Sequence, residues 1–355
     1  MLRKKKRSCL IVGGDHLQWN TQGTNFGYTF FSNQLVNQHF KRILNYWGYL
    51  LTLPDSRYVL IHNYPHHPPL REGPTVYPWL SGPAKQEMVA VACQLDKDPA
   101  SCKERSFESF FVCDTSDEYY GFKSWDDFFT REFKAGQRPV AEGDYVIANP
   151  CEAAPIRIAR NVSEDAKFWL KQQPYSLRNM MNFDPLAKEF VGGTVYQSFL
   201  SALSYHRWHS PVKGIIEKAF VVNGAYFLEN LYEGFANPDG DADPAAAANS
   251  QPFLSAVATR AVIFIRAEND DIGLMCFIGA GMAEVSSCDI TVTEGQKVNK
   301  GDQLGMFHFG GSTKCLVFKP DVEIEFDLYG ITPGVHATNI PVCKKIATVK
   351  PKVKS

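Results

Sequence analysis

A strand-like run ends at two glycines and a serine, and any fold of this chain must accommodate a sharp turn there. The run covers residues 301–309, and Gly310, Gly311 and Ser312 follow it directly. Glycine reaches backbone conformations that are closed to other residues, so the pair can turn the chain sharply. Such a turn can expose the Gly311 carbonyl to attack by the Ser312 hydroxyl. Because most strings of this kind are ordinary turns, the interpretation needs support from elsewhere in the sequence.

Two histidines in a second segment supply groups that could activate that hydroxyl. His206 and His209 stand three residues apart with Arg207 between them, which offers a base and a separate proton donor. The alternatives are a metal-binding pair and a packed aromatic cluster. Pro211 and the strand-like residues 212–222 argue against a long helix, and no third ligand lies nearby in the sequence. We therefore expect no metal at this site.

A third segment, residues 145–155, contributes one carboxylate, Glu152, between short apolar runs. A single glutamate in a loop is usually solvated. Its significance lies in the combination, because a carboxylate can orient an imidazole and the imidazole can activate a hydroxyl. The residues alone do not separate the roles of His206 and His209.

Five motifs in this order resemble the phosphatidylserine decarboxylase family over about residues 115–345. They are residues 126–133, 138–140, 149–152, 205–209 and 309–313. Four segments are most similar to the fungal members that decarboxylate free L-tryptophan, namely 113–114, 119–122, 202–209 and 305–312. Most members of the family carry an aspartate where this chain has Glu152, whereas these fungal members share the glutamate.

The resemblance implies a zymogen that cleaves itself between Gly311 and Ser312. His209, oriented by Glu152, would remove the Ser312 proton, and the hydroxyl oxygen would attack the Gly311 carbonyl and form an ester. Elimination across the Cα–Cβ bond of Ser312 would leave dehydroalanine, which hydrolyses to a pyruvoyl group, the covalent cofactor. This carbonyl would form a Schiff base with the substrate amine and accept the electrons released with carbon dioxide. His206 would then protonate the carbanion.

The resemblance favours a small-molecule substrate, a free aromatic amino acid such as L-tryptophan. The alternative is phosphatidylserine, with phosphatidylethanolamine as the product, and membrane contact is expected only in that case. No run of about 18 apolar residues is present, which favours the free amino acid. A net charge of -1 gives no general attraction to nucleic acid. A non-catalytic binding module is the alternative of another class, and an oligomer is left open.

Targeting and cysteine usage indicate a cytoplasmic protein. The nine cysteines include no Cys-x-x-Cys pair and no signal peptide is visible, so we expect reduced thiols. A basic cluster at residues 3–7 is interpreted as a solvated terminus, with a localisation or phosphate-binding patch as the alternative. Asp239, Asp241 and Asp243 resemble the start of a calcium loop without its later glutamate, which favours a solvated acidic loop over a cation site.

We expect an α+β fold in which a mainly helical N-terminal region, residues 1–110, packs on a mainly antiparallel β catalytic core, residues 111–355. The predicted helices are 31–51, with its apolar stripe in the core, 82–96, part of 167–181, and 124–133 with Ser124 as the N-cap. The predicted strands are 195–200, 214–222, 261–267, 272–279 and 317–326. The glycine spacing across 292–305 indicates a hairpin of the barrel-sandwich type found in biotinyl and lipoyl carriers.

Overall fold

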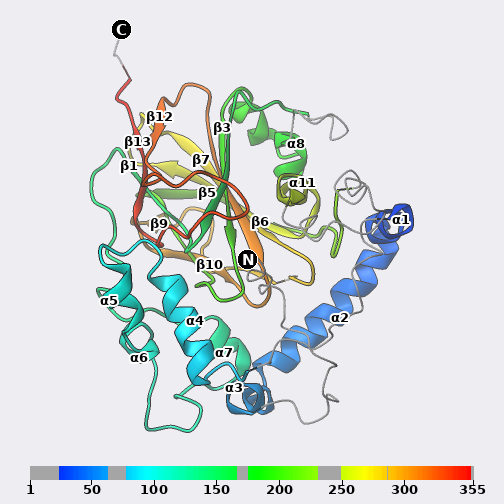
Figure 1. Ribbon diagram of the computed structural model, residues 1–355. Helices are drawn as coiled ribbons and strands as arrows, with labels where there is room; N and C mark the ends of the chain where they lie inside the picture. The colour runs from blue at the N-terminus through cyan, green and yellow to red at the C-terminus, as the bar shows by residue number, and fades with distance from the viewer. Residues whose placement is uncertain (1–23, 63–76, 166–174, 231–248, 286, 353–355) are drawn as a thin grey trace, which may run out of the picture.

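The structure is a computed structural model that describes residues 24–62, 77–165, 175–230, 249–285 and 287–352. Figure 1 shows most strands in the upper part of the molecule and helices α4 to α7 below them, which confirms the predicted α+β class. The described helices are α1 (Asn25–Ser32), α2 (Gln34–Thr52), η2 (Pro54–Arg57), α3 (Tyr58–Ile61), α4 (Gly82–Ala92), α5 (Pro99–Lys103), α6 (Phe107–Phe110), α7 (Trp125–Phe129), α8 (Leu177–Met180), η3 (Pro185–Phe190) and α11 (Gln251–Val257).

The largest sheet among the described residues has seven strands, and every neighbouring pair in it is antiparallel. In spatial order the strands are β2 (Ala154–Arg160), β3 (Thr194–Leu200), β11 (Ser312–Phe318), β7 (Leu274–Gly281), β6 (Arg260–Ala267), β5 (Gly214–Val222) and β9 (Lys297–Val298). Strand β11 therefore lies between two long neighbours, and each of its residues is buried. The predicted strand at 317–326 is instead the end of β11 followed by a separate strand, so its predicted start was wrong.

Two smaller sheets complete the β part. One has the order β1 (Val146–Ala148), β13 (Lys345–Val349) and β12 (Ile324–Phe326), and the other has the order β4 (Arg207–His209), β10 (Gln303–Phe307) and β8 (Cys288–Ile290). The predicted hairpin across 292–305 is wrong, because β9 pairs with β5 whereas β10 pairs with β4 and β8. The pairing of β10 with β4 places both histidines close to the strand that leads to Gly310.

The two faces of the seven-stranded sheet pack against different parts of the protein. Leu316 and Phe318 of β11 join the main apolar cluster, which also contains Trp208, whereas Cys315 and Val317 join a second cluster on the other face. Helices α8 and α11 lie on one side of the sheet in Figure 1. The helices below the strands have a cluster of their own, and Phe309, just before the double glycine, belongs to it. The segment that contains Gly310, Gly311 and Ser312 therefore lies where the helical and β parts meet.

The helix predicted at 31–51 is interrupted at Asn33, which separates the end of α1 from α2. The Asn33 side chain accepts hydrogen bonds from the N–H groups of Leu35 and Val36, which caps α2 and separates it from α1. The expectation that the apolar stripe is core is wrong for part of α2, because Leu35 and Ile43 are each 62% exposed. Figure 1 shows α2 along the outer edge of the molecule. No helix among the described residues is long and apolar enough to cross a bilayer.

One pair of cysteines contradicts the expectation of reduced thiols. Cys93, at the end of α4, and Cys102, in α5, form a disulfide. Their spacing of nine residues carries no recognisable signal, because the bridge depends on how the two helices pack. The other cysteines in the described ranges are free, and five of these six are buried. The acidic loop with Asp239, Asp241 and Asp243 lies outside the described residues.

Candidate active site

Ser312 is the first residue of β11 and lies at the centre of the candidate site. It pairs with Leu200 of β3 on one side and with Gly281 of β7 on the other. The residue is fully buried, and its Oγ has no hydrogen-bond partner. Ser312 is therefore part of a strand, and the bend of the chain lies before it. A buried hydroxyl without a partner is unusual in a folded protein, which marks this atom as a candidate for chemistry.

Only one of the two glycines is required by the backbone. Gly310 has a φ of 84°, and a Cβ atom there would lie 2.3 Å from Cγ2 of Val285. Gly311 has more room, because the nearest atom to a Cβ would be a ring carbon of Phe199 at 3.7 Å. The sharp bend before Ser312 therefore depends on Gly310.

We expect Gly310→Ala to slow any processing at Ser312 at least tenfold, because the side chain meets Val285 in a conformation that alanine avoids. Gly311→Ala is the matched control and should cleave within about threefold of the wild-type rate, since no close contact forms. The rate is measured on denaturing gels after synthesis in a cell-free system. Equal rates for the two variants would contradict the assignment of the bend to Gly310.

The Gly311 carbonyl accepts a hydrogen bond from the backbone N–H of Met282 at 3.2 Å. Attack by the Ser312 hydroxyl would place negative charge on this oxygen. A donor that is already in position stabilises such charge, because it needs no reorganisation during the reaction. This group could not be recognised from the sequence, since any residue except proline supplies a backbone N–H.

His206 is completely buried in the connection between β3 and β4. Its ring stacks on the ring of Phe129, with the two centroids 3.9 Å apart. Burial, assisted by the positive charge of Arg131, lowers the pKa of His206 well below its ordinary value. The imidazole is therefore neutral near pH 7. An open hollow of about 440 Å³ is lined in part by Arg131 and Arg207.

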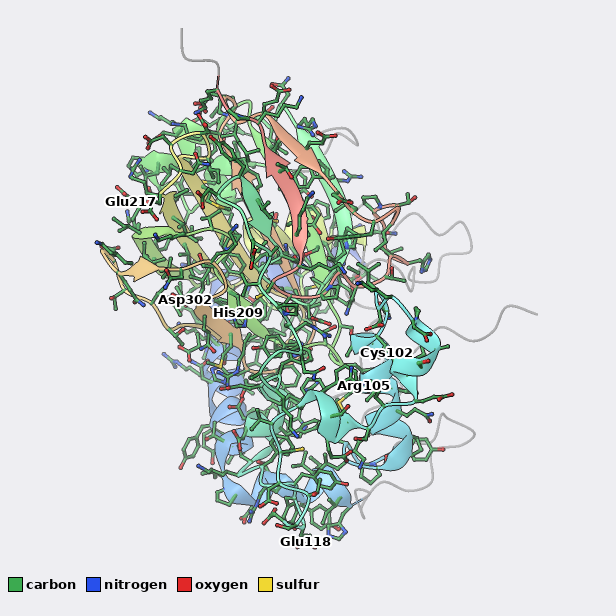
Figure 2. The ribbon with its side chains drawn as sticks, turned by 90° about the vertical axis from the view of Figure 1, so that its left-hand side faces the viewer. Cys102, Arg105, Glu118, His209, Glu217 and Asp302 are labelled. Atoms are coloured by element: carbon green, nitrogen blue, oxygen red, sulfur yellow. A yellow bond between two sulfur atoms is a disulfide. The ribbon has the colours of Figure 1, made fainter. Side chains whose placement is uncertain are left out.

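His209 is held by two hydrogen bonds on β4. Its Nδ1 lies 2.7 Å from the Gly301 carbonyl, and its Nε2 lies 2.9 Å from the Tyr205 hydroxyl. Because a carbonyl can only accept, Nδ1 carries the proton and Nε2 accepts from Tyr205. Burial lowers the pKa of His209 below its ordinary value. Figure 2 shows His209 beside Asp302, where the strands give way to the helices.

The expected pairing of Glu152 with His209 is wrong. The Glu152 carboxylate accepts two hydrogen bonds from Arg138, at 2.6 and 2.9 Å, and one from the Val342 N–H at 2.8 Å. With three bonds already in place, this buried carboxylate links the loop after β1 to residues 138 and 342. Glu152 therefore contacts Arg138 and the backbone at Val342, and Arg138 is a partner that could not be recognised from the sequence.

Two further ionisable residues close to Gly310 and Ser312 were not recognised from the sequence. Glu284 is largely buried, and a Cβ atom on Gly310 would lie 3.1 Å from its Oε1, so this carboxyl group stands next to the bend. Burial raises the pKa of Glu284. Lys314 is fully buried two residues after Ser312. Neither could be recognised from sequence, because a charged side chain in a polar-looking segment is normally exposed.

Comparison with known protein families gives two matches. The model described as phosphatidylserine decarboxylase matches residues 125–334, which contain Glu152, both histidines and Ser312. A second family model, also described as phosphatidylserine decarboxylase, matches residues 16–88. The first match covers more than half of the chain and agrees with the extent of the resemblance seen in the motifs.

Individual relatives are fungal decarboxylases and phosphatidylserine decarboxylases. Decarboxylase iboD of Amanita muscaria is 44% identical over 85% of this chain and 82% of its own length. L-Tryptophan decarboxylase of Psilocybe cyanescens is 37% identical over 93% of this chain and 72% of its own length. Phosphatidylserine decarboxylase proenzyme 3 of Schizosaccharomyces pombe is 29% identical over 63% of this chain and 22% of its own length.

Proposed function

The chain belongs to the phosphatidylserine decarboxylase family and is a carboxy-lyase, and from this premise we propose that it cleaves itself before Ser312 to become a pyruvoyl-dependent amino acid decarboxylase. The proposed catalytic domain is residues 111–355. One observation carries the proposal: a buried Ser312 hydroxyl without a partner adjoins a carbonyl that already accepts a hydrogen bond from Met282. The term proenzyme in the names of several relatives supports the same conclusion.

The chemistry of maturation follows from the groups around Ser312. A base removes the hydroxyl proton, and the oxygen attacks the Gly311 carbonyl while the Met282 N–H stabilises the charge on the carbonyl oxygen. The C–N bond then breaks, an ester replaces the amide, and the amine takes up a proton. Elimination releases Gly311 as a carboxylate. Hydrolysis of the remaining dehydroalanine releases ammonia and leaves a pyruvoyl group, which would supply an electron sink for decarboxylation.

We assign the base in maturation to His209 and the proton donor in turnover to His206. His209→Ala should slow cleavage by about 10²- to 10⁴-fold, whereas His206→Ala should cleave but lose turnover by a similar factor. Because burial lowers the pKa of His209 from 6.5, its imidazole stays neutral and able to accept a proton down to below this pH. We therefore expect the cleavage rate to be level from pH 8 to 6.5 and to fall only in more acidic solution. A His206→Ala chain that stays uncleaved would reverse the assignment.

The proposed substrate is a free amino acid, and the names of the Psilocybe relatives make L-tryptophan the first compound to test. The test has two parts. A denaturing gel reports whether the chain has split into residues 1–311 and 312–355. The intact mass of the second piece then shows whether it begins with a pyruvoyl group. Release of carbon dioxide is then measured with L-tryptophan, L-tyrosine, L-phenylalanine and vesicles that contain phosphatidylserine. An uncleaved chain without activity would contradict the proposal.

Phosphatidylserine is kept as the second candidate because the matching family model carries its name. Activity that is confined to the vesicles would establish the lipid as the substrate. Activity on soluble amino acids alone would exclude it.

A further inference from the structure

Lys314 is a buried amine on the same face of the sheet as Ser312. Side chains alternate between the two faces of a strand, so the residues at 312, 314 and 316 of β11 point to one side. On the neighbouring strand β3, Ser198 lies directly opposite Lys314, and Leu200 lies opposite Ser312. The four residues form two adjacent cross-strand pairs. Whatever is bound at residue 312 therefore has Lys314 and Ser198 as its next neighbours along the strands.

The Lys314 amine has few partners for a group that is completely buried. Its Nζ donates to Oδ1 of Asn149 at 3.1 Å and lies 4.4 Å from the centre of the Tyr196 ring. The Asn149 amide is fixed in this orientation, because its Nδ2 donates to the Ile340 carbonyl at 2.8 Å. Within the described part of the chain, no carboxylate forms an ion pair with Lys314. An ammonium has three N–H donors, so donors remain for another acceptor.

Two hydroxyl groups beside Lys314 are buried, Oγ of Ser198 and Oη of Tyr196, and neither residue has exposed surface. The two hydroxyls interact with each other, and neither has a further partner among the described residues. Because each hydroxyl carries one proton, the pair keeps one O–H donor for another acceptor. Both residues belong to the same face of β3, since they are two positions apart. With Nζ of Lys314 they provide donors that gather on one side of the sheet next to Ser312.

The charge state of Lys314 is consistent with an amine whose anionic partner is supplied by a ligand. Burial lowers the pKa of Lys314 to about 7, so the amine is only partly protonated in neutral solution. A lysine in an apolar interior with one neutral acceptor destabilises the fold. An anion beside the amine would favour its protonated form and restore the missing partner.

We propose that Lys314, Ser198 and Tyr196 bind an anionic group on the side chain of the amino acid substrate. The inference rests on the proposed function, because it takes residue 312 as the place where the substrate amine is held. It narrows the substrate class to amino acids with a second acidic group. L-Tryptophan carries no such group, so it would leave these donors unpaired.

The anion in question is the one on the side chain, not the α-carboxylate. The α-carboxylate leaves as carbon dioxide, and an ion pair that holds its charge in the ground state would raise the barrier to that loss. The distance between residues 312 and 314 also favours an anion at the end of the side chain over the α-carboxylate, which lies next to the amine. Positions 312 and 314 are about 7 Å apart along the strand, since each residue advances about 3.4 Å. An amino acid spans on the order of 5 Å from its amine to a carboxylate at the end of a two-carbon side chain.

The experiment compares two substrates that differ only in this charge. Mature wild-type enzyme, Lys314→Met and the control Lys319→Met are assayed for carbon dioxide release from L-glutamate and L-glutamine, with L-tryptophan and O-phospho-L-serine as further arms. Lys319 is a suitable control because it forms a partly exposed ion pair with Glu189 at the end of the same strand. We expect wild-type enzyme and Lys319→Met to prefer an acidic substrate. In Lys314→Met the ratio of kcat/KM for L-glutamate to that for L-glutamine should fall about 100-fold.

The phosphoserine arm distinguishes a phosphate ester from a carboxylate as the bound anion, and preference for either one supports the proposal. Wild-type enzyme that is cleaved and active on L-tryptophan but not on any acidic amino acid would overturn it while the proposed function stands. An uncleaved, inactive wild-type chain would overturn both.

A second measurement covers the case in which Lys314→Met does not fold. Glutarate and its monoamide are tested as inhibitors of wild-type enzyme between pH 6 and 9. Because Lys314 must gain a proton to pair with the anion, inhibition by glutarate should weaken up to tenfold for each pH unit above about 7. Equal inhibition by the monoamide, or inhibition that does not change with pH, would overturn the proposal.

Discussion

Ser312→Ala is expected to give a single chain of 39.9 kDa that never splits and has no measurable decarboxylase activity. Wild-type protein should instead give a large chain of 311 residues and a small chain of 355 − 311 = 44 residues. The loss should be complete because the hydroxyl oxygen forms the new bond to the Gly311 carbonyl, and alanine has no atom to replace it. Without that bond no pyruvoyl group can form, so turnover is lost together with cleavage.

The measurement is intact mass of purified protein, followed by carbon dioxide release from the substrate panel. Removing this hydroxyl should leave the fold undisturbed, since Oγ of Ser312 makes no hydrogen bond. Ser109→Ala is the control, because the Ser109 hydroxyl only donates to the Ser106 carbonyl at the start of α6. A Ser312→Ala chain that still divides between residues 311 and 312 would show that another group performs the attack.

Much of the scaffold could be predicted because its elements follow strong local rules. The strand predicted at 214–222 has the bounds of β5, in which β-branched and aromatic residues stand at both ends, at 215–216 and 220–222. Ser124 caps α7 by accepting a hydrogen bond from the Asp127 N–H, as the spacing of serine and acidic residues indicated. These features depend on residues that are close in sequence, so the chain itself displays them.

The start of β11 could not be predicted, because its polar residues resemble a turn. Ser312, Thr313 and Lys314 are buried in the middle of the largest sheet. Thr313 is satisfied there by a hydrogen bond from Gln197 at 3.0 Å, from a strand more than 100 residues away in the sequence. Burial of a polar residue becomes intelligible only when its partner is known. Strands are usually recognised by their apolar and β-branched residues, so a buried strand that begins with three polar residues is not recognised from sequence.

Candidate site residues could be selected from the sequence, whereas their hydrogen-bond partners could not. Ser312 and both histidines were selected by residue type and order, and the structure pairs β4 with β10, the strand that precedes Gly310. The partner of Glu152 was not accessible in the same way. His209 was the only expected partner, and Arg138 was not considered, because the contact depends on how the loop after β1 folds against Val342. The assignment of each catalytic role to a histidine stays a prediction until the variants are measured.

Removing Arg138 is expected to destabilise the protein more than removing the charge of Glu152. The Glu152 carboxylate is almost completely buried, with 2% of its side chain exposed, and Arg138→Met leaves it only the Val342 N–H as a donor. An isolated buried charge of this kind costs about 3–5 kcal/mol of unfolding free energy. In Glu152→Gln, Arg138 still donates hydrogen bonds to the carbonyls of Ala92 and Gln137, and its side chain is 12% exposed. We therefore expect the free energy of unfolding to fall by only about 1–2 kcal/mol.

The two residues should also be coupled. The double variant is expected to be about as stable as Arg138→Met alone or slightly more stable, because the stranded carboxylate has become neutral. All variants are unfolded in urea in the Ser312→Ala background, so that cleavage does not alter the chain during the measurement. Arg266→Met is the control, since Arg266 forms an exposed ion pair with Glu217 whose loss should cost less than about 1 kcal/mol.

Cleavage rates in the otherwise wild-type chain then separate the two roles that Glu152 could have. If Glu152 only fixes the loop, Glu152→Gln and Arg138→Met break the same contact, and the less destabilised Glu152→Gln should cleave at least as fast. If the carboxylate acted on an imidazole, Glu152→Gln would slow cleavage by a factor of 10² or more beyond Arg138→Met, because the base would lose its orienting charge. The structure predicts the first result, since the bonds of Glu152 run to Arg138 and Val342 while those of His209 run to Gly301 and Tyr205.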